Sequence, residues 1–393
     1  MKARIKALAD QHLAEITDIR RHLHMHPELS FEEIETGAYI AKTLERFGIP
    51  HKTGVAGHGV VGYIETGRLG RTIALRADID ALPIQEINKV DYISQNPGVM
   101  HACGHDVHSS SLLGTALILD AIKAEMSGRV ILLWQPAEEK IPGGAIKVIE
   151  EGWLDDAEIV LGQHVHPPLH TGRLGLRAGP YMASADEIYV TVKGKGGHGA
   201  LPQDCIDPIV VTAHLITALQ QIVSRYADPT VPSVLTFGKI WSDGGATNII
   251  PNQIFLEGTF RTMDEAWRSK SHELMVNMAE HLCISMGATC DFKILRGYPF
   301  LVNEPELTAE VFADLREFLG EEMVDELPIR MTAEDFAYYS QIKPTCFYRL
   351  GVGNPAKGIG SPLHTNTFNI DESSLATGMG SMAWLAYKAL TSK

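Results

Sequence analysis

Apolar and polar positions follow two kinds of pattern along the first part of the chain, one with helical periodicity and one of short apolar runs. Over residues 4–25 the apolar side chains recur at helical spacing, which predicts an amphipathic helix that ends at His26-Pro27. Short β-branched runs then predict buried strands at residues 60–64, 72–75, 130–134 and 159–161. Helical patterns lie between them, notably over residues 112–122 and 145–151. This alternation predicts an α/β domain with a mainly parallel central sheet.

The pattern of apolar and polar positions changes in the middle of the chain. Residues 187–193 alternate like a half-exposed strand, and the pattern continues with a helix, two strands, a second helix and a strand, over residues 208–226, 234–240, 253–262, 264–286 and 288–295. This order is typical of a small two-layer α+β domain. The first pattern resumes over residues 304–319, 335–341, 346–350 and 373–390. We therefore expect residues 184–297 to form a domain inserted into a larger one made of residues 1–183 and 298–393.

Composition narrows the class of protein. A chain of 393 residues is too long for one typical core, which also favours two domains. The formal charge of −14 argues against nucleic acid and anionic membrane surfaces as partners. The first residues form a charged amphipathic stretch, and no apolar run is about 20 residues long, so we expect neither a signal segment nor a membrane span.

The cysteines indicate a compartment. Five cysteines at irregular spacing fit a reducing cytoplasm better than a disulfide framework. Four of them have apolar neighbours and are predicted to be core thiols: Cys205, Cys283, Cys290 and Cys346. Cys103 is different, because it lies in the run Met100-His101-Ala102-Cys103-Gly104-His105-Asp106-Val107-His108, where thiol, imidazole and carboxylate groups are crowded together.

Residues of metal-binding type follow three of the predicted strands. Asp78 and Asp80 follow residues 72–75, the pair Glu138-Glu139 follows 130–134, and His164 and His166 follow 159–161. In open α/β sheets, ligands bind at the carboxyl ends of the strands. The three strand ends would therefore bring these groups, with Cys103 and His105, to one edge of the sheet. Since Cys103 and His105 have no second pair at zinc-finger spacing, a centre gathered from distant segments is favoured over a structural finger.

Each of these interpretations has an alternative. The loop before residue 107 could simply cap a helix, with Asp106 as the cap residue. Glu138 and Glu139 should point to opposite sides of an extended segment, so that one binds metal and the other faces a water, but a solvated acidic loop would look the same. His164, nearer its strand end, is preferred to His166. His364 has little support from its local sequence.

Three further residues have binding chemistry. His198 lies in the turn Gly194-Lys195-Gly196-Gly197-His198-Gly199, where glycine permits close backbone approach and an imidazole could stabilise an oxyanion. An exposed histidine in a turn, with no role in binding, is an equally good interpretation of His198. The run lacks the lysine-hydroxyl ending of a phosphate loop. Asn248 and Arg261 could bind a substrate carboxylate, although arginine at a strand end is more often a surface residue.

Seven ordered motifs resemble the M20 metallopeptidase family, and specifically its amidohydrolase branch of N-acyl-amino-acid deacetylases, hippurate hydrolases and plant auxin-conjugate hydrolases. They begin at Arg21-His22-Leu23-His24-Met25-His26-Pro27-Glu28-Leu29, Leu75-Arg76-Ala77-Asp78-Ile79-Asp80-Ala81-Leu82-Pro83 and His101-Ala102-Cys103-Gly104-His105-Asp106. They continue with Gln135-Pro136-Ala137-Glu138-Glu139, Gly197-His198-Gly199-Ala200-Leu201-Pro202, Asn248-Ile249-Ile250-Pro251 and Glu334-Asp335-Phe336. The resemblance extends over essentially the whole chain.

The resemblance implies an enzyme with a two-metal catalytic domain and an inserted lid that supports a homodimer. It implies that the metal ligands are Cys103, His105, Glu139, His164 and His364. Glu138 would be the general base and Asp78 a carboxylate that orients the site. His198 would contact the substrate carbonyl, in related dimers from the partner subunit. Thiolate ligation favours Zn²⁺, with Mn²⁺, Co²⁺ or Ni²⁺ as alternatives.

The implied reaction is hydrolysis of N-acyl amino acids, such as N-acetyl or N-benzoyl compounds, to a carboxylic acid and a free amino acid. A dipeptidase or carboxypeptidase on the same scaffold is the nearest alternative. A non-catalytic binding protein is disfavoured because Glu138, the ligand set and His198 are intact. Two departures stand out: Lys140-Ile141-Pro142 precedes Gly143-Gly144, where the branch usually has glycines, and the last motif reads His364-Thr365-Asn366-Thr367-Phe368.

Overall fold

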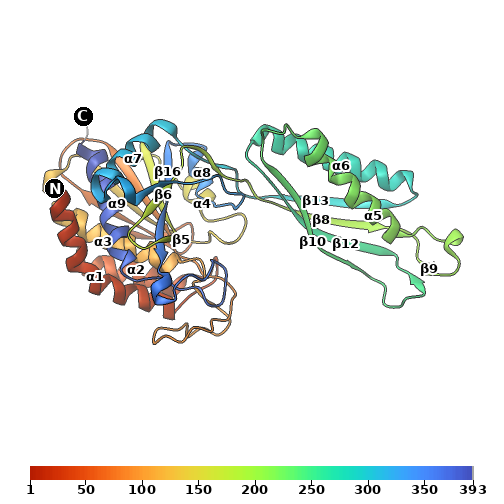
Figure 1. Cartoon of the computed structure of the whole chain (residues 1–393), viewed down its shortest axis with the longest axis horizontal. Helices are drawn as coiled ribbons and strands as arrows, with labels where there is room; N and C mark the ends of the chain where they lie inside the picture. Colours follow the sequence, from red (N-terminus) through yellow and green to blue (C-terminus); the bar gives the residue numbers. More distant parts are fainter. Residues whose placement is uncertain (392–393) are drawn as a thin grey trace. The chain divides into compact units, whose positions relative to one another are not determined.

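The computed structural model describes residues 1–391, and these form two compact units (Figure 1). The large unit comprises Met1–Tyr181, Val302–Pro328 and the chain from Asp335 onward, and the small unit comprises Met182–Leu301 and Ile329–Glu334. Strands β7 (Gly179–Met182) and β14 (Leu301–Asn303) lie where the chain passes between the units. The catalytic and lid roles expected for the two domains remain predictions.

The large unit is built on a mixed sheet whose order, within residues 1–391, is β1-β2-β4-β3-β5-β16-β6-β15. The strands are β1 (His51–Val55), β2 (Gly59–Glu65), β3 (Thr72–Asp78), β4 (Arg129–Gln135), β5 (Ile159–His170), β6 (Leu174–Leu176), β15 (Val324–Glu326) and β16 (Thr345–Gly353). The central neighbours β4, β3, β5 and β16 all pair in parallel. This confirms the predicted α/β fold with a mainly parallel central sheet.

Helices cover this sheet and complete its core. Helices α1 (Lys2–Met25), α3 (His105–Ile122) and α9 (Ser374–Thr391) pack against one another (Figure 1). The large unit also contains α2 (Ile34–Arg46), α4 (Ala145–Glu150), α7 (Pro305–Leu319) and α8 (Ala337–Ser340), with 3-10 turns at Lys123–Glu125, Glu321–Met323 and Pro355–Lys357. The continuous apolar runs predicted for the central strands are explained by burial of both sheet faces.

The parallel register aligns the carboxyl ends of the central strands. Asp78, the last residue of β3, pairs with Gln135, the last residue of β4. On the other side of β3, Arg76 pairs with Gly162 of β5, two residues before His164. The polar residues that follow these strands are therefore delivered to one edge of the sheet.

The small unit has two layers, as expected for an α+β domain. Its antiparallel sheet has the order β10-β12-β8-β13 within the described chain. The strands are β8 (Asp186–Lys193), β10 (Ser233–Ser242), β12 (Gln253–Thr262) and β13 (Thr289–Arg296). Helices α5 (Pro208–Leu219) and α6 (Glu265–Ser285) pack on one face, where Val190 and Leu256 meet Leu215 and Met275. A separate pair joins β9 (Gly197–His198) to β11 (Ile249–Ile250).

Two sequence expectations in the small unit were wrong in detail. The helix predicted over residues 208–226 ends at Leu219 and is followed by a π-helical turn, Ile222–Tyr226. Cys205 and Cys290 are only half-buried, whereas Cys283 and Cys346 are buried as predicted. Cys205 follows a surface 3-10 turn, Pro202–Asp204, and Cys290 lies on β13, which is an edge strand.

No helix within residues 1–391 is both long enough and apolar enough to cross a membrane.

Candidate metal centre

Three groups from separate segments of the large unit lie around the Cys103 thiol. Sγ of Cys103 lies 3.4 Å from Nε2 of His164 and 3.4 Å from Nε2 of His364. The same His364 nitrogen is 3.2 Å from Oε1 of Glu139. Cys103, His105 and His164 are buried, whereas 53% of the His364 side chain is exposed. The cluster therefore opens to solvent on the side of His364.

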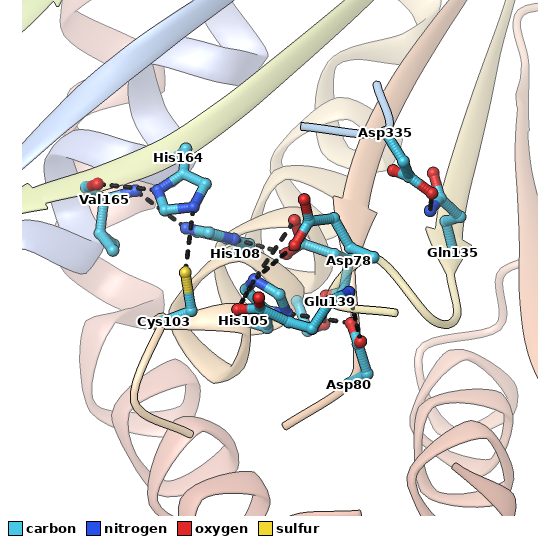
Figure 2. A network of polar contacts seen from close by, with 12 residues as sticks. Asp78, Asp80, Cys103, His105, His108, Gln135, Glu139, His164, Val165 and Asp335 are labelled. Atoms are coloured by element: carbon cyan, nitrogen blue, oxygen red, sulfur yellow. Dashed lines mark hydrogen bonds and ion pairs between the residues drawn. The ribbon is translucent and has the colours of Figure 1, made fainter. Parts of the chain in front are cut away.

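His105 is at the centre of four carboxylates. Its Nε2 lies 3.7 Å from Oδ2 of Asp78, 3.8 Å from Oε2 of Glu138 and 3.9 Å from Oε1 of Glu139. Its Nδ1 lies 3.1 Å from Oδ1 of Asp80 (Figure 2). Both Glu138 and Glu139 thus approach the same nitrogen of His105, rather than pointing to opposite sides of their segment.

The donor atoms fit a divalent cation. Among residues 1–391, no group hydrogen-bonds Nε2 of His105, although the atom is fully buried. Buried imidazole nitrogens without partners are costly, and a cation would use that lone pair. Cys103, His105 and His164 form one set of ligand atoms within reach of a single ion, and Cys103, Glu139 and His364 form another. Cys103, which belongs to both sets, thus connects groups that could hold two ions.

Two unusual backbone positions allow this convergence. Gly104 precedes α3 with φ of +81°, and a Cβ there would lie 2.6 Å from Cγ2 of Val165. Only glycine tolerates both the left-handed conformation and this approach. Ala137 also has a positive φ, of 57°, and its N–H donates to Oε1 of Glu33 at 2.7 Å. This turn lies between the end of β4 at Gln135 and the pair Glu138-Glu139.

Asp106 is not the cap of α3, which corrects the alternative considered from sequence. The helix begins at His105 with Gly104 as its N-cap. Asp106 instead faces α1, where Nε of Arg20 donates to its Oδ2 at 2.8 Å and Nδ1 of His24 lies 2.8 Å from the same oxygen. The buried ion pair fixes the helix end that carries His105 to the N-terminal helix.

The charge balance of the cluster also calls for cations. Burial, and then the negative charges of Glu139 and Glu138, raise the pKa of the Cys103 thiol well above its usual range. Burial acts to lower the pKa of His105, but Asp78 and Asp80 outweigh it and raise the value to about 10. A bound divalent cation would reverse this balance, because its charge favours thiolate and neutral imidazole.

The neighbouring imidazoles are held neutral, which is the form that binds metal. Burial, followed by the positive charge of Arg349, lowers the pKa of His164 well below its usual range. Nδ1 of His164 donates to the carbonyl oxygen of Val165 at 2.8 Å. Nε2 therefore carries no proton, and its lone pair is directed toward Cys103 and available to a metal ion. Burial also lowers the pKa of His108.

Several residues that hold the cluster in place were given no role in the site from the sequence. Asp80 accepts a hydrogen bond from Ser30 Oγ at 2.6 Å and from the Glu139 backbone N–H at 2.9 Å. Buried Arg76 donates to Asp78 at 2.7 Å and to Asp335 at 2.7 Å. The sequence had placed Asp80 at this edge of the sheet, two residues after Asp78, but without a role. Nothing local distinguishes the roles of Arg76 and Asp335, because their contact spans most of the chain.

The remaining predicted residues lie in the small unit. His198, on β9, is exposed, and its neighbour Gly199 donates its N–H to the Asn248 carbonyl at 2.8 Å. The structure thus brings His198 and Asn248 together. Arg261 lies on β12, eight residues beyond Gln253 and opposite Val234. At about 3.4 Å per residue, that is about 27 Å along the strand from the end that adjoins β9 and β11.

Comparisons with known proteins point to one family. The model of peptidase family M20/M25/M40 matches residues 74–388. The chain is 41% identical over 305 residues to an N-acyl-L-amino acid amidohydrolase of Geobacillus stearothermophilus, covering 78% of this chain and 82% of the relative. It is also 40% identical over 376 residues to thermostable carboxypeptidase 2 of Saccharolobus solfataricus, covering 95% of each. The Bacillus subtilis YXEP protein, a dinuclear metal-binding peptidase from the M20 family, aligns with a TM-score of 0.81 and 34% identity, over 97% of this chain and 99% of that one.

Proposed function

Because the chain belongs to peptidase family M20/M25/M40, whose members here include amidohydrolases and carboxypeptidases, we propose that it is a metal-dependent N-acyl-amino-acid amidohydrolase. Its substrates would be small molecules such as N-acetyl or N-benzoyl amino acids, and its products a carboxylic acid and a free amino acid.

One observation carries this proposal, namely that thiol, imidazole and carboxylate donors from distant segments meet beside the Glu138 carboxylate. The proposed ligands of two divalent ions are Cys103, His105, Glu139, His164 and His364. Glu138 lies at the same cluster, with Oε2 3.8 Å from Nε2 of His105, and its residue is 6% exposed. The thiol donor favours Zn²⁺, and Mn²⁺, Co²⁺ or Ni²⁺ are alternatives.

The chemistry divides between the ions and the side chains. Two divalent ions, when bound, supply the Lewis acidity that activates a water and polarises the amide carbonyl. Glu138 takes the proton of the attacking water and returns it to the leaving amine. Asp78 orients the cluster, because Arg76 and His108 both bind its carboxylate, at 2.7 and 2.5 Å. His198 donates a hydrogen bond to the carbonyl oxygen as charge develops there.

The geometry of the small unit supports a homodimer. We assign substrate binding to Asn248 and Arg261 and carbonyl contact to His198. Since Arg261 is about 27 Å along β12 from the strand end that adjoins His198 and Asn248, one N-acyl amino acid cannot touch both ends of the same unit. If all three act on one substrate, two copies of the chain must contribute, as in a symmetric dimer.

The direct test is amino-acid release from a panel of N-acetyl amino acids, N-benzoyl amino acids and dipeptides. Each substrate is assayed after chelator treatment and again after addition of Zn²⁺ or Mn²⁺. We expect turnover of an N-acyl class that chelator abolishes and metal restores. Turnover that survives complete metal removal, or no turnover of any N-acyl compound by the metal-loaded protein, would contradict the proposal.

A carboxypeptidase is the second candidate, because thermostable carboxypeptidase 2 is as similar to this chain as the amidohydrolase is. Lys140-Ile141-Pro142 directly follows the two glutamates, where it could reshape the substrate pocket. Turnover of the dipeptides alone would move the assignment to peptidase.

We keep the cytoplasm as the predicted location, on the basis of the five cysteines, which are all free in the structure.

A further inference from the structure

His108 lies between Asp78 and His164, and both of its ring nitrogens are engaged (Figure 2). Its Nδ1 is 2.5 Å from Oδ1 of Asp78, and its Nε2 accepts the backbone N–H of Val165 at 2.8 Å (Figure 2). The residue is 1% exposed and projects from the first turn of α3. One imidazole therefore bridges the end of β3 and the middle of β5.

The two hydrogen bonds fix the protonation of the ring. Nε2 faces an N–H donor, so it carries no proton. Nδ1 faces a carboxylate oxygen, so it carries one. His108, Asp78 and His105 lie close enough together to be considered as a cation site. However, with both His108 nitrogens used in this way, the ring has no lone pair left for a metal, and its role is to hold other groups.

The two groups that contact His108, Asp78 and the Val165 backbone, each lie next to a proposed metal ligand. The other Asp78 oxygen lies 2.7 Å from Nη1 of Arg76 and 3.7 Å from Nε2 of His105. On the β5 side, the Val165 residue that donates to His108 also accepts from Nδ1 of His164. That bond directs Nε2 of His164 toward Cys103, 3.4 Å away.

We propose that His108 is a positioning residue that acts on both sides of the cluster: it holds the Asp78 carboxylate 3.7 Å from Nε2 of His105, and it sets His164 through the Val165 backbone. The inference rests on the proposed metal centre. Partners that orient metal-binding side chains typically change metal affinity about 10- to 100-fold when they are lost. His108 should have an effect of this size without touching the metal.

Three substitutions separate the two hydrogen bonds. His108→Leu removes both of them. His108→Asn can place an amide N–H near the position of Nδ1, which restores only the bond to Asp78. His108→Gln can place an amide oxygen near the position of Nε2, which restores only the bond from Val165. Thr115→Ala is the matched control, because Thr115 is also buried on α3 but its hydroxyl donates to the carbonyls of Ser111 and Met379, at 2.8 and 3.2 Å, away from the cluster.

The measurement is Zn²⁺ affinity of the chelator-stripped full chain, by titration against a competing indicator, with the melting temperature recorded in parallel. We expect His108→Leu to weaken Zn²⁺ binding about 10- to 100-fold, each amide variant to weaken it less, and Thr115→Ala to leave it unchanged. Wild-type affinity in His108→Leu would overturn the inference. So would equal losses in all three His108 variants at an unchanged melting temperature.

Because the readout is binding, this test is distinguishable from a test of the reaction. A wild-type protein that binds Zn²⁺ but hydrolyses no N-acyl amino acid would count against the proposed function alone. The ratio of each variant's Zn²⁺ affinity to that of the wild type would still decide whether His108 is a positioning residue.

Discussion

Nε2 of His364 lies 3.4 Å from Sγ of Cys103, although 261 positions of sequence separate the two residues. A backbone hydrogen bond holds the two loops together, because the His364 N–H donates to the Ala102 carbonyl at 2.9 Å. His364 has a positive φ of 59°, a conformation that non-glycine residues seldom adopt. Strained backbone of this kind is typical of functional sites.

The position of Cys103 between two imidazoles predicts that the thiol is a metal ligand. Cys103→Ser should lower Zn²⁺ affinity at least tenfold, because a hydroxyl is a much poorer donor than a thiolate for this metal. Isothermal titration of the chelator-stripped protein measures the change. Cys205→Ser is the control, since Cys205 is half-buried in the small unit. Equal Zn²⁺ affinity in the two variants would rule out ligation by Cys103.

Glu138 should be needed for turnover but not for metal binding. Loss of a general base typically costs about 10²- to 10⁴-fold in rate, so Glu138→Gln should be nearly inactive while its metal content, measured by elemental analysis, stays at the wild-type level. Glu139→Gln should lose metal as well as activity. Glu150→Gln changes an exposed carboxylate on α4 and should do neither. A Glu138 variant that keeps more than about a tenth of the wild-type rate would remove it from the role of base.

Mixed dimers can show whether His198 acts on the partner subunit. Glu138→Ala and His198→Ala should each be inactive alone. In a heterodimer, the site with an intact Glu138 would receive the intact His198 of the other chain, so random exchange of equal amounts should restore about one quarter of wild-type activity. No recovery, after exchange is verified by native mass spectrometry, would mean that both residues act within one chain.

Glu33 should give the metal-free protein a dependence on pH. Burial, and then the charge of Asp80, raise its pKa to about 7 from an ordinary value near 4.5. The folded state therefore binds this proton more tightly than the unfolded state, and stability falls as the pH rises from about 4.5 to about 7. The free energy of unfolding should fall by up to about 3 kcal/mol over this range. Glu33→Gln should flatten the melting temperature over this range, and a profile parallel to wild type would contradict the assignment.

Sequence patterns predicted the parts of the fold and site that depend on short-range order. The strand ends at Asp78 and at Glu138 and Glu139 follow from continuous apolar runs, so their common edge could be expected. His364 could not be found in this way, because its contact with Cys103 depends on how distant loops pack. The family resemblance, rather than local pattern, named it.

His108 illustrates the opposite case. It stands in the most conspicuous run of the sequence, yet its type and spacing fit a metal ligand as well as a positioning residue. Only the partners of its two nitrogens distinguish the roles. Asp106 is similar, since a carboxylate at a helix start resembles a cap, and only the packing of α1 shows that it pairs with Arg20 and His24.

The order of the central strands has a consequence for synthesis on the ribosome. The small unit comes mostly from one continuous stretch, Met182–Leu301, so nearly all of it has been translated before the large unit is complete. Strand β16 completes the sheet beside β5 only after residue 353 has emerged, and α9 covers α1 and α3 later still. Until then β5 presents an unpaired edge, which is prone to association with other chains. A nascent chain stalled near residue 300 should therefore depend on chaperones, whereas the released full-length chain should not.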